Sequence, residues 1–136
     1  MEYLFCKPLG LILVTSKAVL TAAEMRAFHK KLMDDPDVPP GMKELMDLRG
    51  LDIVAVDAKV VQEISAIEAA RTDRVGSAQI AVVAPGPVAF GLSRMYESLS
   101  GSTPKKVCVF SEMKPALEWL GITPDELRKH LPQVQV

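Results

Sequence analysis

The chain has 136 residues, of which 49% are hydrophobic and 24% charged, and its formal net charge is −1. This length and composition are typical of one compact domain that folds without a metal or a disulfide. The near-neutral charge argues against a nucleic-acid-binding surface, and no uncharged apolar run approaches the roughly 20 residues of a membrane helix. The N-terminal stretch lacks the basic start and cleavage site of a signal peptide. We therefore expect one domain over residues 1–136 that is cytoplasmic, binds no nucleic acid and is not inserted in a membrane.

The first third of the chain predicts a β-hairpin followed by a helix. Residues 2–6 and 11–19 are rich in branched and apolar side chains. They are separated by residues 7–10, in which Pro8 and Gly10 indicate a turn. Thr21 and Glu24 have the spacing of a capping box, so a helix is expected from there to about Asp34. The proline-rich residues 34–41 then predict a loop.

The rest of the chain predicts alternating strands and helices. Strands are expected near 44–48, 78–84 and 106–110, and the second of these lacks alternation, as in a strand covered on both faces. The helix starts and stops are indicated by capping residues, prolines and glycines. These signals are Asp57 to Gly76, Pro87 to Gly101, Ser111 to Gly121, and Thr123 to His130.

The element order is therefore β-β-α-β-α-β-α-β-α. This order predicts an α/β fold with a mostly parallel five-stranded sheet, an antiparallel edge and helices packed on the sheet. The last three strands should be mutually parallel, because a helix separates each successive pair.

Several stretches in this order resemble the SpoIIAA-like family, bacterial relatives of STAS domains. They are GLILVTSKAVLTAAEM (10–25), the proline-rich loop before LMDLRG, QIAVVAP with the following GLSRMYE (91–97), and KVCVFSEMKPALEWL (106–120). The resemblance implies a sheet of four or five strands covered by helices, with distant kinship to CRAL-TRIO lipid carriers, and it implies no catalytic chemistry.

One departure from that family concerns regulation. In its anti-sigma-factor antagonists, an aspartate ending the third strand is followed by a phosphorylatable serine. Here Asp47 is followed by Leu48, Arg49 and Gly50, and the next hydroxyl side chain is Ser65. We therefore expect no phosphorylation switch at this loop.

The usual catalytic and cofactor patterns are not found. The two histidines and two cysteines have no metal-ligand spacing, and no glycine-rich phosphate loop occurs. Ser93 falls inside a predicted helix rather than on a nucleophile elbow. His29 is interpreted as a packed or half-exposed helix residue rather than a general base. We therefore predict no catalytic residue, metal or cofactor.

Two further interpretations concern lysines and cysteines. Lys105 and Lys106 are interpreted as a solvated edge between a turn and a strand. Cys6 and Cys108 are interpreted as buried thiols, and a disulfide between them requires that their strands be close.

The candidate site comes from topology. In open parallel sheets, ligands bind outside the carboxyl ends of the strands, where helix N-termini also point. The candidate ligand-binding residues there are Arg49, Gly50, Pro85, Gly86 and Ser111. Arg49 could clamp an anion or a polar head group, and the alternative is a turn residue paired with Asp47 or Asp52.

Two functions remain open at this stage. The first is a non-enzymatic regulatory or protein-interaction module, a homodimer or the partner of another protein, that uses the surface around LMDLRG and PGP. The second is a carrier or sensor of a small apolar or amphipathic ligand, held between the sheet and a helix with Arg49 at its polar end. The second is favoured by the methionines of the predicted helices, which suit an adaptable apolar pocket.

Overall fold

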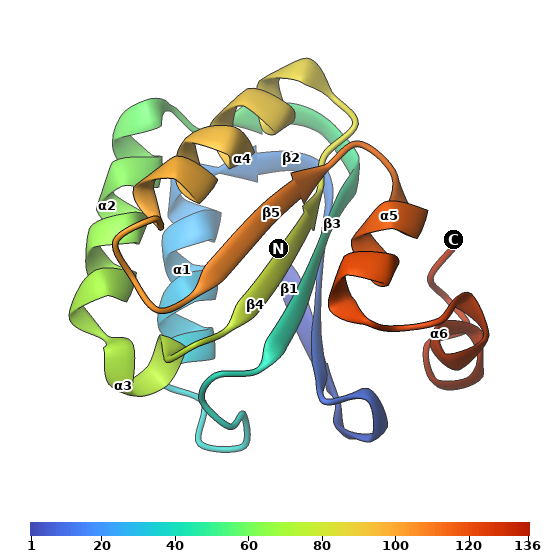
Figure 1. Ribbon diagram of the computed structural model, residues 1–136. Helices are drawn as coiled ribbons and strands as arrows, with labels where there is room; N and C mark the ends of the chain where they lie inside the picture. Colours follow the sequence, from blue (N-terminus) through green and yellow to red (C-terminus); the bar gives the residue numbers. More distant parts are fainter.

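The computed structural model describes all residues, Met1–Val136, as a single α/β domain. A five-stranded mixed sheet separates two layers of helices, with α1, α2 and α4 on one face and α5 and α6 on the other (Figure 1). The strands are β1 (Glu2–Cys6), β2 (Leu11–Thr21), β3 (Lys43–Ala55), β4 (Gln79–Val83) and β5 (Lys106–Phe110). The helices are α1 (Ala22–Met33), α2 (Ala58–Ala70), α3 (Thr72–Val75), α4 (Pro87–Leu99), α5 (Met113–Leu120) and α6 (Pro124–His130), with a 3-10 turn η1 (Lys7–Leu9). None of the helices has both the length and the hydropathy needed to cross a bilayer.

The strands lie in the sheet in chain order, β1 to β5. β1 pairs antiparallel with β2, and the other three pairings are parallel, so the expected parallel relation of β3, β4 and β5 is confirmed. The sheet as a whole is mixed rather than mostly parallel, because the hairpin supplies an antiparallel edge.

Cys6 and Cys108 lie on β1 and β5, the two opposite edges, and both are free thiols. A disulfide between them is therefore excluded within one chain.

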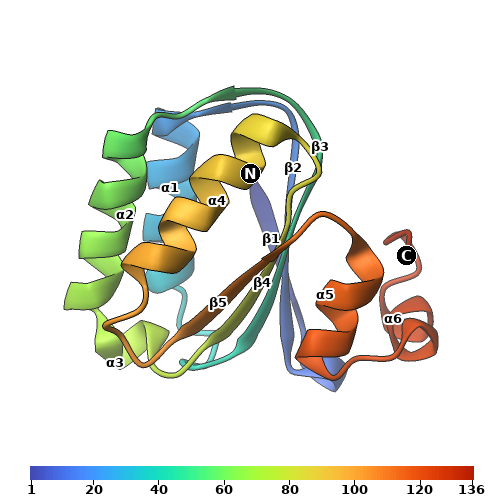
Figure 2. The same cartoon turned by 45° about the horizontal axis from the view of Figure 1, so that its top comes forward.

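β2 and β3 are longer than predicted. The expected ends at residues 19 and 48 are wrong, since pairing continues to Thr21 and Ala55. β4 stops opposite Asp47, and beyond that point β2 and β3 continue as a two-stranded extension that curves toward α1 and α2 (Figure 2). The pairing register shifts between Thr15 and Lys17 and again next to Ala18, whose φ of 58° is unusual for a residue with a Cβ.

Gly50 lies opposite the first of these irregularities. A Cβ at this position would stand 2.8 Å from the carbonyl oxygen of Ser16 on β2. The glycine therefore permits a close approach of two backbones at the bend. This approach explains why a glycine interrupts an apolar strand, and it shows that the strand does not end there.

Alternating side chains of the sheet build two separate cores. On the α5 and α6 face, Leu45 and Val83 pack with Leu117 and Leu127. On the other face, a second core contains Met46, Val82 and Ala84 from the strands, together with Phe28 from α1. A third cluster lies under the β2–β3 extension, where Leu20, Val56, Val60, Val61 and Ile64 meet.

Most predicted helix starts are confirmed by their caps. Thr21 accepts a hydrogen bond from the Glu24 amide, Asp57 accepts one from the Val60 amide, and Thr123 forms a reciprocal capping box with Glu126. The prediction that Ser111 caps α5 is wrong. The N-cap residue is Glu112, and its side chain makes no capping bond.

We expect Gly50→Ala to lower the free energy of unfolding by about 1–3 kcal/mol, because the added methyl group would push Ser16 and β2 away. Gly91→Ala is the matched control. Gly91 lies in α4, where a methyl group added to the glycine would meet no atom within 4 Å, so alanine there should stabilise by about 0.5–1 kcal/mol. Urea denaturation of both variants measures the difference, and equal effects would contradict the close approach at Gly50.

Candidate functional site

A buried cluster of charged side chains lies between the helices and the sheet. Its centre is the carboxylate of Glu68 on α2, of which 5% is exposed. Glu68 accepts hydrogen bonds from His29 Nε2 on α1 at 3.1 Å and from the Tyr96 hydroxyl on α4 at 2.7 Å. Lys105, just before β5, donates a third bond to the same carboxylate. Glu68 thus links three separate elements.

His29 is held in its protonated form. Its Nδ1 lies 3.1 Å from the carbonyl oxygen of Met25, which can only accept, and its Nε2 faces the Glu68 carboxylate. Both ring nitrogens must therefore carry protons. Burial alone would lower the pKa of His29, but the hydrogen bond and charge of Glu68 outweigh it and raise the pKa.

The pKa of Glu68 is lowered, whereas that of His29 is raised. Burial favours the neutral acid, yet the hydrogen bond and charge of His29, together with Lys105, hold the pKa of Glu68 below its usual value. Burial, followed by the charges of Glu68 and Glu44, raises the pKa of Tyr96 well above its usual value, so its hydroxyl stays protonated and donates.

Lys105 is not a solvated residue. Its side chain is 1% exposed, and its Nζ lies 3.2 Å from the Tyr96 hydroxyl and 4.6 Å from the centre of the Tyr96 ring. The sequence interpretation of Lys105 as part of a solvated edge is therefore wrong, whereas Lys106 is exposed. The buried ammonium is stabilised by Glu68 and by the ring face.

Glu44 on β3 is the one member of this region without a hydrogen-bond partner. It is buried, and burial together with the nearby Glu68 charge raises the pKa of its carboxyl to about 7, against the weaker opposing effects of His29 and Lys105. Glu44, His29 and Glu68 line a small cavity between α1, α3 and the sheet, with an open volume of about 60 Å³. A cavity of this size can hold water that solvates the carboxyl.

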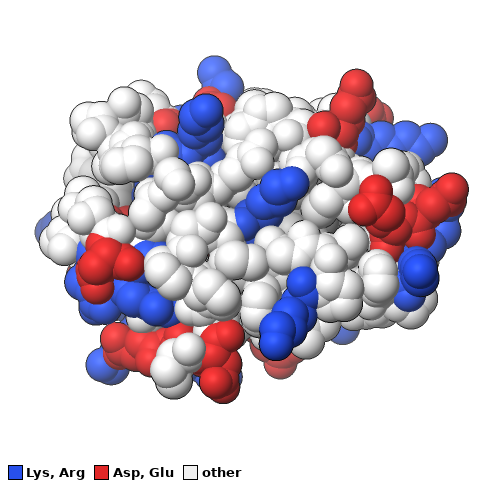
Figure 3. Space-filling view, turned by 60° about the horizontal axis from the view of Figure 1, so that its bottom comes forward, with Lys and Arg blue, Asp and Glu red and all other residues white.

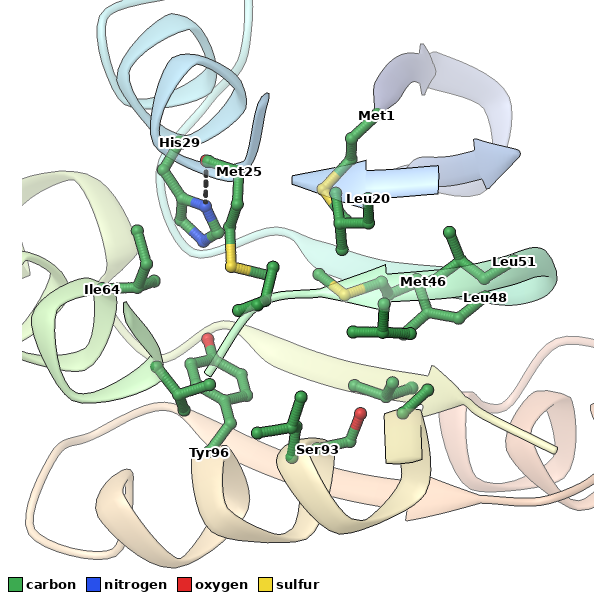
Figure 4. A pocket seen from close by; sticks show the side chains of 16 residues that line it. Met1, Leu20, Met25, His29, Met46, Leu48, Leu51, Ile64, Ser93 and Tyr96 are labelled. Carbon is green, nitrogen blue, oxygen red and sulfur yellow. Dashed lines mark hydrogen bonds between the residues drawn. The ribbon is translucent and has the colours of Figure 1, made fainter. Parts of the chain in front are cut away.

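A second cavity of about 60 Å³ lies on the other side of His29, below the β2–β3 extension. Fourteen of its sixteen lining residues are hydrophobic, and apart from Met1 and Val56 the lining residues come from β2, β3, β4, α1, α2 and α4. Figure 4 shows Met25, Met46, Leu51 and Ile64 around this apolar cavity. The two remaining residues are His29 and Ser93, and a third hydrogen-bonding group is the hydroxyl of Tyr96, which is counted among the fourteen.

The predicted site residue Arg49 lies on the opposite face of the sheet. Its guanidinium forms a bidentate pair with Asp47, both bonds at 2.9 Å, and donates to the backbone carbonyl of Gln135 at 2.7 Å. This is the ion pair that the sequence left open as an alternative. Arg49 and Gly50 line an open polar groove together with Lys17 of β2 and residues 133–135 of the C-terminal segment.

Pro85, Gly86 and Ser111 do follow the carboxyl ends of β4 and β5, as predicted, and all three are exposed. None of them lines the groove that contains Arg49 and Gly50. The structure therefore divides the five predicted residues between two places. It brings together a different set, in the apolar cavity and the Glu68 cluster.

Sequence reasoning missed Glu68, Tyr96 and Lys105 as members of a site. A signal was present for Glu68, which stands on the same helix face as Val61 and Ile64, where an amphipathic helix is normally apolar. No comparable signal existed for Lys105, because its partners come from segments far away in the sequence.

No protein-family model matches the chain, and no curated protein matches it closely enough to indicate a relationship.

We expect Glu68→Gln to lower the free energy of unfolding by about 3–5 kcal/mol, because it leaves the ammonium of Lys105 buried without a counter-charge. Glu63→Gln is the matched control. Glu63 lies on the same helix and pairs with Arg26 at the surface, so its loss should cost about 1 kcal/mol or less. Chemical denaturation of both variants at one pH measures the difference, and equal losses would contradict a buried pair.

We expect Glu44→Gln to change how stability depends on pH. The pKa of Glu44 is about 7 in the folded chain and 4.5 for an unperturbed carboxyl, so the folded form binds its proton more tightly. This stabilisation is fully present below about pH 4.5 and is lost as pH rises through about 7, a loss of about 3 kcal/mol. Glutamine stays neutral, so the variant should gain stability relative to the parent at about pH 8 compared with about pH 4. Glu118→Gln, at an exposed position on α5, should leave the pH profile unchanged.

Proposed function

We propose that this chain is a non-enzymatic binding module, a carrier or sensor that takes a small apolar or amphipathic molecule into the apolar cavity. The supporting observation is the lining of this cavity, fourteen hydrophobic residues of sixteen with a few convergent polar groups, which is the usual composition of a small-molecule site. The resemblance of the chain to the SpoIIAA-like family, with its distant kinship to lipid carriers, supports the same proposal.

The size of the cavity sets a condition on this function. An open volume of about 60 Å³ is less than half of the roughly 150 Å³ of a cavity that binds benzene, so a ligand of more than a few heavy atoms requires side chains to move. Met1, Met25 and Met46 line the cavity, and methionine adapts easily because its chain is unbranched and has three rotatable bonds. The cavity can therefore enlarge by rotamer changes without a change of fold.

The distribution of charged residues on the surface agrees with this proposal. The face in Figure 3 shows lysines and arginines interspersed with aspartates and glutamates around uncharged areas, rather than one continuous basic patch. This distribution supports a ligand recognised by apolar contact more than one recognised by long-range electrostatics.

The other proposal, a regulatory module that binds a protein partner, would use a different surface. The open groove on the α6 side contains Arg49, Gly50 and Lys17, has a volume of about 730 Å³ and is lined mainly by polar residues. Native mass spectrometry of the purified protein distinguishes the two proposals. An adduct that disappears on denaturation supports the carrier, and a doubled mass without an adduct supports the protein-interaction module as a homodimer.

We expect a small apolar probe such as 1-hexanol to enter the cavity. With methionine methyl groups labelled by carbon-13, the NMR signals of Met25 and Met46 should shift in a saturable way. Met113 is the internal control, because it lies in the core on the opposite face of the sheet and its signal should not move.

A cavity-filling variant completes this experiment. Ala89 lines the cavity from α4, so Ala89→Leu should weaken binding of the probe at least tenfold, whereas Ala69→Leu on the exposed side of α2 should not. No saturable shift in the parent protein, or an equal shift at Met113, would refute the proposed function.

A further inference from the structure

Three side chains of the cavity wall carry a hydrogen-bonding group, namely His29, Ser93 and the largely apolar Tyr96. The groups of His29 and Tyr96 already have hydrogen-bond partners. Both ring nitrogens of His29 are used, one by the Met25 carbonyl and one by Glu68. The Tyr96 hydroxyl donates to Glu68 and accepts from Lys105. A ligand could use these groups only by breaking bonds to a buried charge, which is costly.

Ser93 is different, because its hydroxyl makes no hydrogen bond. It lies in α4 between Ala89 and Tyr96 in the cavity wall, and 8% of the residue is exposed. Buried helical serines commonly bond back to the carbonyl four residues earlier, as Ser100 does with Tyr96 at 2.8 Å, but Ser93 does not. Figure 4 shows its hydroxyl directed away from α4, among the side chains that line the cavity.

The charged groups around the cavity are already paired with one another. His29 is the only cationic side chain in the wall, and Glu68 neutralises it. The N-terminal ammonium of Met1, another lining residue, is paired with the Glu24 carboxylate at 3.5 Å. Glu68 also binds Lys105, and Arg49 lies on the opposite face of the sheet, paired with Asp47. An ionised ligand would therefore lose its hydration and find a single hydroxyl in return.

We propose that the apolar cavity selects a neutral ligand with one hydrogen-bonding group, an alcohol or a carbonyl compound, and that the Ser93 hydroxyl is the residue that binds this group. This inference rests on the proposed function. It replaces Arg49 as the partner of the ligand's polar end, and it excludes a fatty-acid anion as the preferred ligand class.

Three probes of equal chain length test the proposal: 1-hexanol, hexanoate at about pH 8, where the acid is ionised, and hexane. Their binding is followed by the Met25 and Met46 methyl signals. We expect 1-hexanol to bind at least tenfold more tightly than hexanoate. Ser93→Ala should weaken 1-hexanol binding about 3- to 10-fold, the range for one neutral hydrogen bond, and leave hexane binding unchanged.

Two further variants test whether the effect of Ser93→Ala comes from the loss of its hydroxyl in the cavity or from the loss of any buried serine. Ser65→Ala is the matched control, since Ser65 is also a buried helical serine without a hydrogen bond but does not line the cavity. It should change no affinity. Ser93→Thr keeps the hydroxyl and should keep the preference for 1-hexanol over hexane that Ser93→Ala loses.

The outcomes separate this inference from the proposed function. If hexane and 1-hexanol bind but hexanoate binds equally well, the preference for a neutral ligand is refuted. If Ser93→Ala weakens both neutral probes alike or neither of them, the role of Ser93 is refuted. In both cases the cavity remains a binding site. If no probe gives a saturable shift in the parent protein, the proposed function fails and the inference fails with it.

Discussion

The buried carboxylate of Glu68 is the interaction on which the rest of the helical layer depends. A single ionised group, on α2, receives donors from α1, from α4 and from the residue before β5. In a low-dielectric interior each donor needs the carboxylate, and the carboxylate needs the donors, so none of these elements can shift without breaking a hydrogen bond to a buried charge. The positions of α1, α2 and α4 are thereby fixed relative to the sheet at the level where both small cavities lie.

This arrangement also determines what the apolar cavity can bind. A charged cluster next to a cavity usually suggests a site for a charged ligand. Here the donors and acceptors of the cluster are used up internally, and His29 separates the apolar cavity from the one that contains Glu44. The cluster therefore works as a rigid wall rather than as a recognition group. Recognition is left to apolar contact and to the one hydroxyl in the cavity wall that has no partner, that of Ser93.

Local signals were sufficient to predict most of the elements and their order, because caps such as Thr21, Asp57 and Thr123 act within one helical turn. They failed where the decisive contact is distant in sequence. No residue close to Lys105 in the sequence indicates that its ammonium pairs with Glu68. The adjacent residues Lys105 and Lys106 are therefore predicted to be solvated. The Arg-Gly pair at 49–50 was interpreted as a strand end for the same reason, because the partner strand that continues beside it, β2, lies some thirty residues earlier. The candidate site was consequently sought at the face of β3 that carries Arg49, opposite the apolar cavity.

The Arg49-Gly50 pair nevertheless has a part in the site, through backbone geometry. Gly50 lets β3 approach Ser16 where the register of β2 shifts, and past this point the two strands curve as a pair (Figure 2). The curved section carries Leu20, Leu51 and Val54 over the space between α1, α2 and α4, and these residues form the roof of the apolar cavity. On the other face, Arg49 is fixed by Asp47 and by the Gln135 carbonyl, which holds the strand at the position where the curve begins. A cation and a glycine within an apolar strand thus shape a cavity that neither residue lines.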